Sequence, residues 1–377
     1  MNITLKRTTE QLELIKAMAS KNRTVAYEAQ VALAEFIGPV ISEVINNAPT
    51  LSNMFTTLQF NADDNPSIPL DLYYDVTDQD YIQVWSQSTP GGLPVNHVAP
   101  TASELKFSTY QLDSAVSFDK RYASRSRLDV VGKTFTRVAQ EVLLKQERTS
   151  ANLILGTLAE ATTNGKTHAI HSATNNRFLL ADLNALMTRS KRVNSSWDGG
   201  TPENRGRGIT DLVCSPEILE EIRSMAYNPI NSLAAKGIAA AADSGVIAAP
   251  DSVREGVWTN AGIPEFYGVS IMEINELGVG QKFNAIFNTL AGTTSFDGPN
   301  SAAGQFADGD EIVIGVDLVS GRDAMLRAVA TDPDSNAEFS LSADDQYSIR
   351  QKKIGYFGSL EEGRMIVDNR VLFGLIV

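Results

Sequence analysis

Cysteine and histidine are scarce in this chain of 377 residues, which contains one cysteine and three histidines. The single thiol, Cys214, excludes both an internal disulfide framework and a metal cage built from thiolates. Two histidines, His168 and His171, lie in the stretch HAIH, but a closed zinc or iron site needs further ligands and no acidic residue stands beside them. We therefore expect no metal ion, no cofactor and no disulfide.

Long hydrophobic runs are absent as well. No apolar run reaches the ~18 residues that a membrane-spanning helix needs. The opening stretch MNITLKRTTEQLELIKAMAS carries charges every few positions, unlike the apolar core of a signal peptide. With 43% hydrophobic and 20% charged residues, the composition is that of a folded globular protein. We expect a soluble protein that is made in the cytoplasm and has no membrane partner.

Positively charged residues are fewer than negatively charged ones. The chain has 32 Lys and Arg and 45 Asp and Glu, which gives a net charge of −13. A protein that grips the phosphate backbone normally presents a basic face, so this balance argues against a dedicated nucleic-acid binder. It does not exclude a protein that surrounds DNA without binding it tightly.

Motifs of common active sites are also missing. There is no Gly-x-Ser-x-Gly elbow, Cys214 lies in an apolar segment where thiols are usually inert, and GVGQK at 278–282 lacks the spacing of a phosphate-binding loop. DPDSNAE begins like a calcium loop at Asp332, but Ala337 and Ala343 occupy the positions that require Gly and Glu. We expect no catalytic residue, and an enzyme with an unrecognised site is the lowest-ranked alternative.

Helical spacing is present in residues 1–48, where apolar side chains recur every three or four positions. They are Leu12, Ile15, Ala19, Val31, Ala34, Ile37, Ile41 and Ile45. Pro39 and Pro49 are expected to interrupt or end these helices. Such an amphipathic arm packs either on its own core or on a neighbour.

Strand character follows in residues 56–118. LYYDV and YIQVW are rich in aromatic and β-branched residues, and ELKFSTYQLDSAVSF alternates, while SQSTPGGLPVNHVAP between them reads as an irregular tip. The pattern predicts a long two-stranded excursion. A lone hairpin is marginal in water, so we expect Tyr81 and Trp85 to contact a neighbouring subunit.

An uninterrupted helical stripe runs through residues 127–158 and predicts a rod of more than ~40 Å. A second helix is predicted at 180–193, and ITDLVCSPEILEEIRSMAYN predicts a buried strand, a turn at Pro216 and a helix. After an Ala-rich insertion at 233–250, short strands are predicted in GVSIMEIN, KFNAIFN and DEIVIGVDL, and a polar link at 331–346. The final VLFGLIV is an apolar run that must be paired in a sheet or covered.

A basic cluster lies between the predicted excursion and the predicted rod. Its members are Lys120, Arg121, Arg125 and Arg127, in the stretch DKRYASRSR. Most charge runs are solvated faces, but this one also fits an interface patch that meets acidic residues of a neighbouring subunit. The acidic candidates are Asp308, Asp310 and Glu311 in ADGDE, and a DNA contact ranks third.

The order of these parts resembles the major capsid proteins of tailed phages, which have the Hong Kong 97-like fold. YIQVWSQSTPGGLPVNHVAPTASELKFSTYQLDSAVSFDKRYASRSRLDV is similar to the family's extended loop and its run into the spine helix, and VLLKQERTSANLILGTL is similar to the end of that helix. DLVCSPEILEEI resembles the entry to the axial domain, and EIVIGVDLVSGRDAML and GSLEEGRMIVDNRVLFGLIV resemble the last strands.

The resemblance implies an α+β fold with five parts. These are an N-terminal arm at 1–57, an extended loop at 58–125, a peripheral domain with the spine helix at 126–205, an axial domain at 206–335, and strands at 336–377 that return to the peripheral domain. The isopeptide crosslink of some relatives is not carried over, because no residue here matches its Lys, Asn and Glu.

The same resemblance implies a structural role. It predicts the major capsid protein of a tailed double-stranded DNA bacteriophage, self-assembling into hexamers and pentamers of an icosahedral shell that encloses the genome. The implied partners are further copies of the chain, portal and scaffolding proteins, a cement or decoration protein, and enclosed DNA that is not bound sequence-specifically. The implied location is the virion capsid, assembled in the host cytoplasm. Encapsulins share the fold, so an encapsulin-like compartment shell is the alternative.

Overall fold

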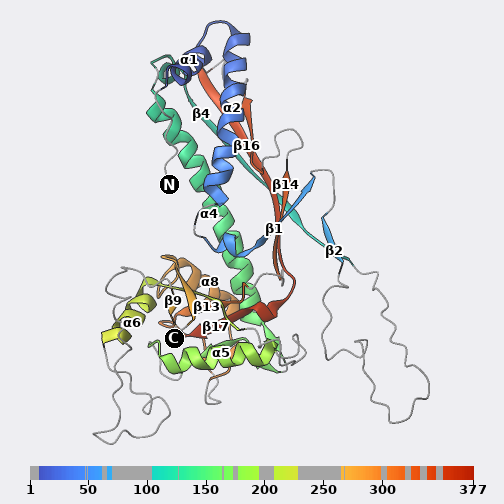
Figure 1. Cartoon of the computed structure of the whole chain (residues 1–377), viewed down its shortest axis with the longest axis vertical. Coiled ribbons are helices and arrows are strands. Elements are labelled where there is room, and N and C mark those ends of the chain that lie inside the picture. Colours follow the sequence, from blue (N-terminus) through green and yellow to red (C-terminus); the bar gives the residue numbers. More distant parts are fainter. Residues whose placement is uncertain are drawn as a thin grey trace, which may run out of the picture. The chain divides into compact units, whose positions relative to one another are not determined.

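The computed structural model of the chain describes residues 8–46, 48, 50–61, 66–69, 104–125, 127–163, 165–172, 177–194, 208–227, 265–266, 268–298, 304–318, 324–331, 338–344 and 351–377. The chain forms two compact units, each built from segments that are distant in the sequence (Figure 1). The first takes Met1–Ile68, Glu104–Ser150 and Met325–Met365, and the second takes Pro69–Ser103, Ala151–Ala324 and Ile366–Val377. Both units contain helices and strands, which confirms the expected mixture of the two.

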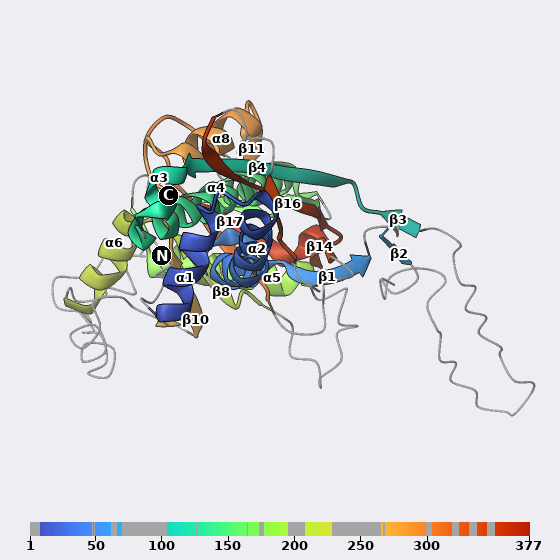
Figure 2. The same cartoon turned by 90° about the horizontal axis from the view of Figure 1, so that it is seen from above.

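The first unit contains helices on one face of a five-stranded sheet. Its helices are α1 (Thr9–Met18), α2 (Arg23–Asn46), α3 (Lys120–Ser124), the 3₁₀-helix η1 (Leu51–Met54) and most of α4 (Leu128–Glu160). Its strands are β1 (Thr56–Asn61), β4 (Thr109–Asp119), β14 (Met325–Thr331), β15 (Ser340–Asp344) and β16 (Lys353–Ile366). The sheet runs β1-β14-β16-β15, with β4 also paired to β16. In Figure 2, α2 is seen end-on beside β14 and β16.

Strand β4 is held by a long antiparallel ladder with β16, in which Phe118 pairs with Ile354, Val116 with Tyr356 and Leu112 with Leu360. Residues two apart point to the same face of a strand, so these alternating apolar side chains all face the helices. The alternation that predicted a strand in ELKFSTYQLDSAVSF is thereby confirmed.

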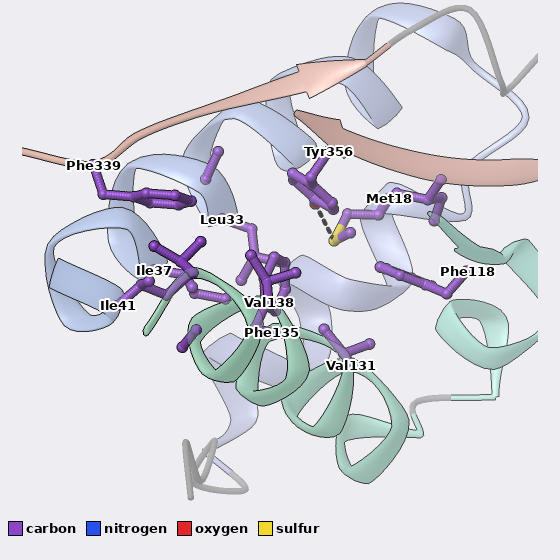
Figure 3. Packing of buried hydrophobic residues seen from close by; sticks show 14 of the residues in the cluster. Met18, Leu33, Ile37, Ile41, Phe118, Val131, Phe135, Val138, Phe339 and Tyr356 are labelled. Carbon is purple, nitrogen blue, oxygen red and sulfur yellow. Dashed lines mark hydrogen bonds between the residues drawn. The ribbon is translucent and has the colours of Figure 1, made fainter. Parts of the chain in front are cut away.

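Side chains from the helices and the sheet fill a single core in this unit (Figure 3). Phe135 of α4 lies edge-on to the ring of Tyr356, at 5.2 Å between centroids, and Phe118 stacks on the same ring. The buried hydroxyl of Tyr356 donates to Sδ of Met18 on α1, at 3.9 Å. The N-terminal helices are therefore packed into the core of their own unit along one side, which leaves the opposite side of α2 uncovered by these contacts.

Helix α2 contains Pro39 in its interior, so the expectation that this proline interrupts the helix is wrong. A proline costs a helix about 3 kcal/mol, because it removes one hydrogen bond and crowds the preceding turn. Ile37 and Ile41 on either side of it are fully buried in the core. Tertiary packing of both turns therefore offsets the local cost.

Helix α4 confirms the predicted rod, running without interruption over 33 residues. The predicted stripe is buried at Val131, Phe135 and Val138. The first part of the helix belongs to the first unit, and its residues from Ala151 onwards belong to the second.

The second unit contains a six-stranded mixed sheet with helices on both faces. Its strands are β7 (Ala169–His171), β17 (Leu372–Ile376), β13 (Ile312–Val316), β8 (Asp211–Cys214), β10 (Val269–Glu273) and β9 (Glu265–Phe266), in that order. Its helices are α5 (Leu180–Asn194), α6 (Pro216–Tyr227), α8 (Lys282–Ala291) and the 3₁₀-helix η4 (Asn369–Val371). Residues of α5 and α6 pack on one face of the sheet. Three short pairs complete the described strands, namely β2 (Ser67–Pro69) with β3 (Glu104–Lys106), β5 (Thr162–Thr163) with β6 (Lys166–Thr167), and β11 (Ser295–Phe296) with β12 (Gly304–Gln305).

The apolar C-terminal run is paired inside this sheet. Strand β17 lies between β7 and β13, and all five of its residues are buried. The backbone N–H of Val377 donates to the carbonyl of Glu311, and the N–H of Glu311 donates to the carbonyl of Val377, both at 2.9 Å. The terminus therefore needs no covering partner.

Two predicted elements are wrong. KFNAIFN forms helix α8 instead of a strand, because Phe283, Phe287 and Ala291 are spaced by four residues and are all buried. The polar link at 331–346 contains strand β15, which pairs with β16, and Phe339 before it is buried in the core. A Cβ atom at Gly358 would clash with the Phe339 ring, so the two positions fit each other.

Three predicted stretches, LYYDV, YIQVW and the Ala-rich insertion at 233–250, lie outside the described residues. The predicted helix at 180–193 and the strand and helix around Pro216 are confirmed by α5, β8 and α6. Within the described part of the chain, no helix combines the length and apolar character needed to cross a membrane.

Candidate assembly surfaces

The basic cluster lies at and just beyond the end of β4, where the chain forms the short helix α3. Asp119 caps this helix by accepting a hydrogen bond from the backbone N–H of Arg121, at 2.9 Å. The Arg121 guanidinium also donates to the same carboxylate, and these hydrogen bonds lower the pKa of Asp119. Lys120 donates from Nζ to the backbone carbonyl of Ser20, at 2.9 Å. Two of the four predicted cations are therefore engaged within their own unit.

Arg125 and Arg127 are exposed and have no ion-pair partner among the described residues. Tyr122 beside them is 45% exposed. An exposed tyrosine close in sequence to arginines that have no ion-pair partner in the described chain is typical of interface composition, because aromatic residues and arginine are enriched at the centres of protein interfaces. Arg121 is also exposed but is paired with Asp119. We therefore use the term exposed part of the basic cluster for Arg125 and Arg127 together with the neighbouring Tyr122.

The predicted acidic partners have unequal exposure in the second unit. Asp308 is exposed and accepts a hydrogen bond from Nδ2 of Asn288, at 3.2 Å. Asp310 and Glu311 are each only 5% exposed. Oδ2 of Asp310 accepts from the N–H of Ala307 and lies 3.4 Å from Nε2 of His171. Of the three, Asp308 alone presents its side chain to solvent in the described chain.

Burial also changes the acidity of Glu311. It raises the pKa of this carboxyl to about 7, against a hydrogen bond with Ser215 that lowers it, and the carboxylates of Glu217 and Glu221 raise it further. Oε1 of Glu311 has no hydrogen-bond partner within the described structure. The group is thus partly protonated near neutral pH.

A buried polar network lies where β4 begins, centred on the fully buried Glu362 of β16. Oε2 of Glu362 accepts from Nε of Arg327 at 2.9 Å, from Nη2 of Arg364 at 3.1 Å and from Nε2 of Gln146 at 3.0 Å, and the Tyr110 hydroxyl donates to Oε1 at 2.7 Å. Burial alone would raise the pKa of Glu362, but Arg364, Arg327 and the hydrogen bond from Tyr110 lower it. The carboxylate is therefore ionised and fully hydrogen-bonded.

This network connects five elements of the first unit, namely β4, β16, α4, β14 and η1. Tyr110 is the partner of Glu362 in the β4–β16 ladder, Gln146 comes from α4 and Arg327 from β14. Arg364 also donates to Oγ of Ser52 at 2.7 Å and to the carbonyl of Gln146 at 3.0 Å. Nε of Arg364 has no hydrogen-bond partner in the described structure, but both carboxylate oxygens of Glu362 are hydrogen-bonded, and a buried network of this kind fixes the relative positions of its members. The start of β4 is therefore rigidly attached to the sheet and to α4.

Glu362 is not among the residues predicted from the sequence, although a signal for it is present there. Ile354, Tyr356 and Leu360 alternate along one face of β16, and Glu362 continues that alternation. A charged residue at an inward-facing strand position is rare unless it is paired, so it indicates a buried partner.

The second surface is the outer face of α2, formed by positions 25, 28, 32, 35, 36, 39 and 43, which are all exposed. Their spacing of three and four residues places them on one side of the helix, opposite the buried stripe. Phe36 is 54% exposed and Val25 is 41% exposed. Glu28, Glu35 and Glu43 flank these apolar side chains and have no ion-pair partner among the described residues. The face is therefore apolar and acidic, and no described residue covers it.

Tyr81 and Trp85, the predicted contact residues of the excursion, lie outside the described residues. The structure does place the two ends of that segment together, because β2 and β3 are paired. The N–H of Phe107 donates to the carbonyl of Pro66, at 3.1 Å, next to this pair. The contact role of Tyr81 and Trp85 stays a prediction.

His168, considered as a metal ligand, and Cys214, the single thiol, are both buried in the second unit. Nδ1 of His168 lies 3.1 Å from the carbonyls of Asn369 and Leu372, Nε2 lies 2.7 Å from Oγ1 of Thr163, and burial lowers the pKa of this histidine. Burial raises the pKa of Cys214 to about 12. In the described part of the chain, no three His, Cys, Asp or Glu side chains are grouped as metal ligands. His168 and Cys214 are core residues of the second unit.

No protein-family model matches the chain, and no curated protein matches it. Among solved structures, the capsid of a native GTA particle is 12% identical with a TM-score of 0.48, over 87% of this chain and 89% of that one. The capsid of the cyanophage P-SCSP1u is 13% identical with a TM-score of 0.45, over 87% and 88%. The holo-SrpI encapsulin complex from Synechococcus elongatus PCC 7942 is 11% identical with a TM-score of 0.43, over 86% and 85%. The solved structures that this chain resembles thus include capsids and an encapsulin, the two kinds of shell protein that the sequence resemblance names.

Proposed function

We propose that the chain is the major capsid protein of a tailed double-stranded DNA phage, with a Hong Kong 97-like fold. The observation that supports this most directly is the order of its parts. Two N-terminal helices are followed by an excursion that closes at β2 and β3, by the 33-residue helix α4, by an inserted second unit, and by strands that return to both units. No part of this arrangement requires a catalytic centre.

The excursion supports self-assembly. Strands β2 and β3, which flank residues 70–103 in the sequence, are paired, and the network around Glu362 holds the start of β4 in place. The sequence of this segment includes Tyr81 and Trp85. A ribbon of this length with large aromatic side chains is stabilised by lying on another surface. We propose that this surface belongs to a neighbouring copy.

Repeated contacts account for a stable shell. A standard protein interface buries about 800 Å² on each partner, and several such contacts per subunit add up through multivalency while each stays reversible during assembly. The net charge of −13 suits a container that encloses DNA without binding it tightly. Hexamers and pentamers in a virion capsid, assembled in the host cytoplasm with portal and scaffolding proteins and a cement protein, complete the proposal.

Light scattering and electron microscopy of the purified chain, over a series of protein and salt concentrations, test the proposal. We expect closed particles or sheets of hexamers and pentamers, and DNA-filled shells when the chain is produced with the other virion proteins. Small cages that hold a protein cargo would instead establish the encapsulin-like alternative. A chain that stays a monomer or dimer under every condition would overturn both shell functions.

A further inference from the structure

We infer that the outer face of α2 is a docking site for a second copy of this chain, whose Tyr122, Arg125 and Arg127 it binds. The inference rests on the proposed shell function and specifies one of its contacts. It starts from the exposed part of the basic cluster, because the acidic residues first considered as its partners are largely buried. With Asp310 and Glu311 each 5% exposed, the stretch ADGDE offers these arginines one exposed carboxylate, Asp308, so a surface with several exposed carboxylates matches them better.

The outer face of α2 has the matching composition. Its carboxylates, Glu28, Glu35 and Glu43, follow one side of the helix at intervals of seven and eight residues, or about 10–12 Å. Phe36 and Val25 lie among them with roughly half of their side chains in solvent. Arginine and tyrosine pair well with such a surface, since guanidinium groups bind carboxylates and both side chains pack on apolar atoms.

A second copy is favoured over the chain's own undescribed excursion. Residues 70–103 contain no Lys or Arg, but they contain Asp71, Asp75, Asp78 and Asp80. Like charges placed opposite each other at an interface cost free energy, so this segment does not suit an acidic helix face. The exposed arginines beside α3 provide the opposite charge, and every copy carries both surfaces.

The symmetry of such a contact agrees with a shell. The surface on α2 differs from the surface around α3, so the contact is heterologous, and each subunit uses one surface towards each of two neighbours. Heterologous contacts close into rings when the rotation between copies divides a full turn. The inferred contact therefore belongs to the type that builds hexamers and pentamers.

Charge reversal with rescue by mixing tests the inference. One variant carries Glu28→Lys, Glu35→Lys and Glu43→Lys, and the other carries Arg125→Glu and Arg127→Glu. Because all five side chains are exposed, each dissociated subunit should unfold at the wild-type midpoint. Each variant alone should need at least about a tenfold higher concentration to assemble, since its own two surfaces now repel. Mixed in equal amounts, they should assemble again as alternating six-membered rings, because every contact between unlike copies is complementary.

The outcomes separate the alternatives. A chain that carries all five substitutions should also regain assembly, and if it does so while the mixture does not, the contact lies within one chain and the inference is wrong. If only the arginine variant fails to assemble, the arginines bind elsewhere, for example to the aspartates at 71–80, and the α2 site is wrong. If both variants assemble like the wild type, the inference fails while the shell function stands. A wild-type chain that never assembles would instead refute the shell function.

Discussion

The buried carboxylates of Glu362 and Glu311 lie in opposite surroundings. Glu362 is compensated by two arginines, and its pKa is lowered. Glu311 has two further carboxylates nearby, and its pKa is raised to about 7. The two groups therefore change the free energy of unfolding in opposite directions with pH. Glu362 stabilises the fold above its unfolded pKa, and this stabilisation is lost as the pH falls through its lowered folded pKa.

Substitution of Glu362 by Gln should strongly destabilise the first unit. It removes the counter-charge of the buried Arg364 and leaves Arg327 with Glu338 alone, at 3.6 Å, and breaking a buried ion pair in this way costs about 3–5 kcal/mol. Chemical denaturation followed by near-UV circular dichroism measures the loss. Glu361→Gln is the matched control, because that side chain lies on the other face of β16 and is partly exposed. A loss below about 1 kcal/mol for Glu362→Gln would show that the network does not hold the sheet together.

Substitution of Glu311 by Gln should stabilise the chain at pH 8 by about 1–3 kcal/mol and have little effect below pH ~4.5. A carboxyl whose folded pKa is raised is favourable when protonated, below its unfolded pKa, and loses that contribution as the pH rises through about 7. Denaturation midpoints of wild type and variant across this range check the sign. Asp308→Asn, an exposed neighbour, should show no such pH dependence. An equal difference between wild type and Glu311→Gln at all pH values would contradict the explanation.

At the scale of elements, β17 shows how close packing depends on glycine. A Cβ atom at Gly374 would lie 2.9 Å from Cδ2 of Leu158 and 3.2 Å from Cβ of Ala169. The strand, the end of α4 and β7 therefore approach one another more closely than any side chain at this position allows. Gly156 of α4 is different, because its nearest atom would be 3.9 Å away, in Leu290.

Alanine at these two glycines should change stability with opposite signs. Gly374→Ala overpacks the sheet, which typically costs about 1–3 kcal/mol. Gly156→Ala makes only an ordinary contact with Leu290, at 3.9 Å, and it lies in a helix, where alanine is favoured by up to about 1 kcal/mol. Thermal unfolding of both variants measures the two shifts. If Gly374→Ala unfolds at or above the wild-type midpoint, the strand is not packed against Leu158 as closely as the structure shows.

At the scale of the whole molecule, deletion of residues 76–100 should separate folding from assembly. Strands β2 and β3 are paired, so the two ends of the excursion lie close together. A short Gly-Ser linker can therefore replace residues 76–100 without straining the core. We expect a subunit with wild-type near-UV circular dichroism that forms no particles in light scattering. A control that replaces only residues 89–92, in the Gly- and Pro-rich part of the segment, with the same linker should still assemble. Particles formed by the deletion variant would show that the excursion is not an assembly element.

Elements whose residue pattern is complete within a short stretch could be predicted from the sequence. The stripe of α4 and the alternation of β4 each contain enough apolar positions in one period to specify helix or strand. The sequence also predicted the basic cluster as a charged surface. It did not show that Lys120 and Arg121 form hydrogen bonds within their own unit.

Other features depend on contacts between distant residues that outweigh local preference, and these could not be predicted from the sequence. Helix α2 stays helical through Pro39 because the turns on either side of it are packed in the core. KFNAIFN forms helix α8 because one face of that helix is buried. Strand β15 forms within a predicted polar link because it pairs with β16. The burial of Asp310 and Glu311 and the pairing of the apolar C-terminus between β7 and β13 likewise depend on partners far away in the chain. Local sequence sets the period of an element, whereas long-range contacts set which of its residues are buried.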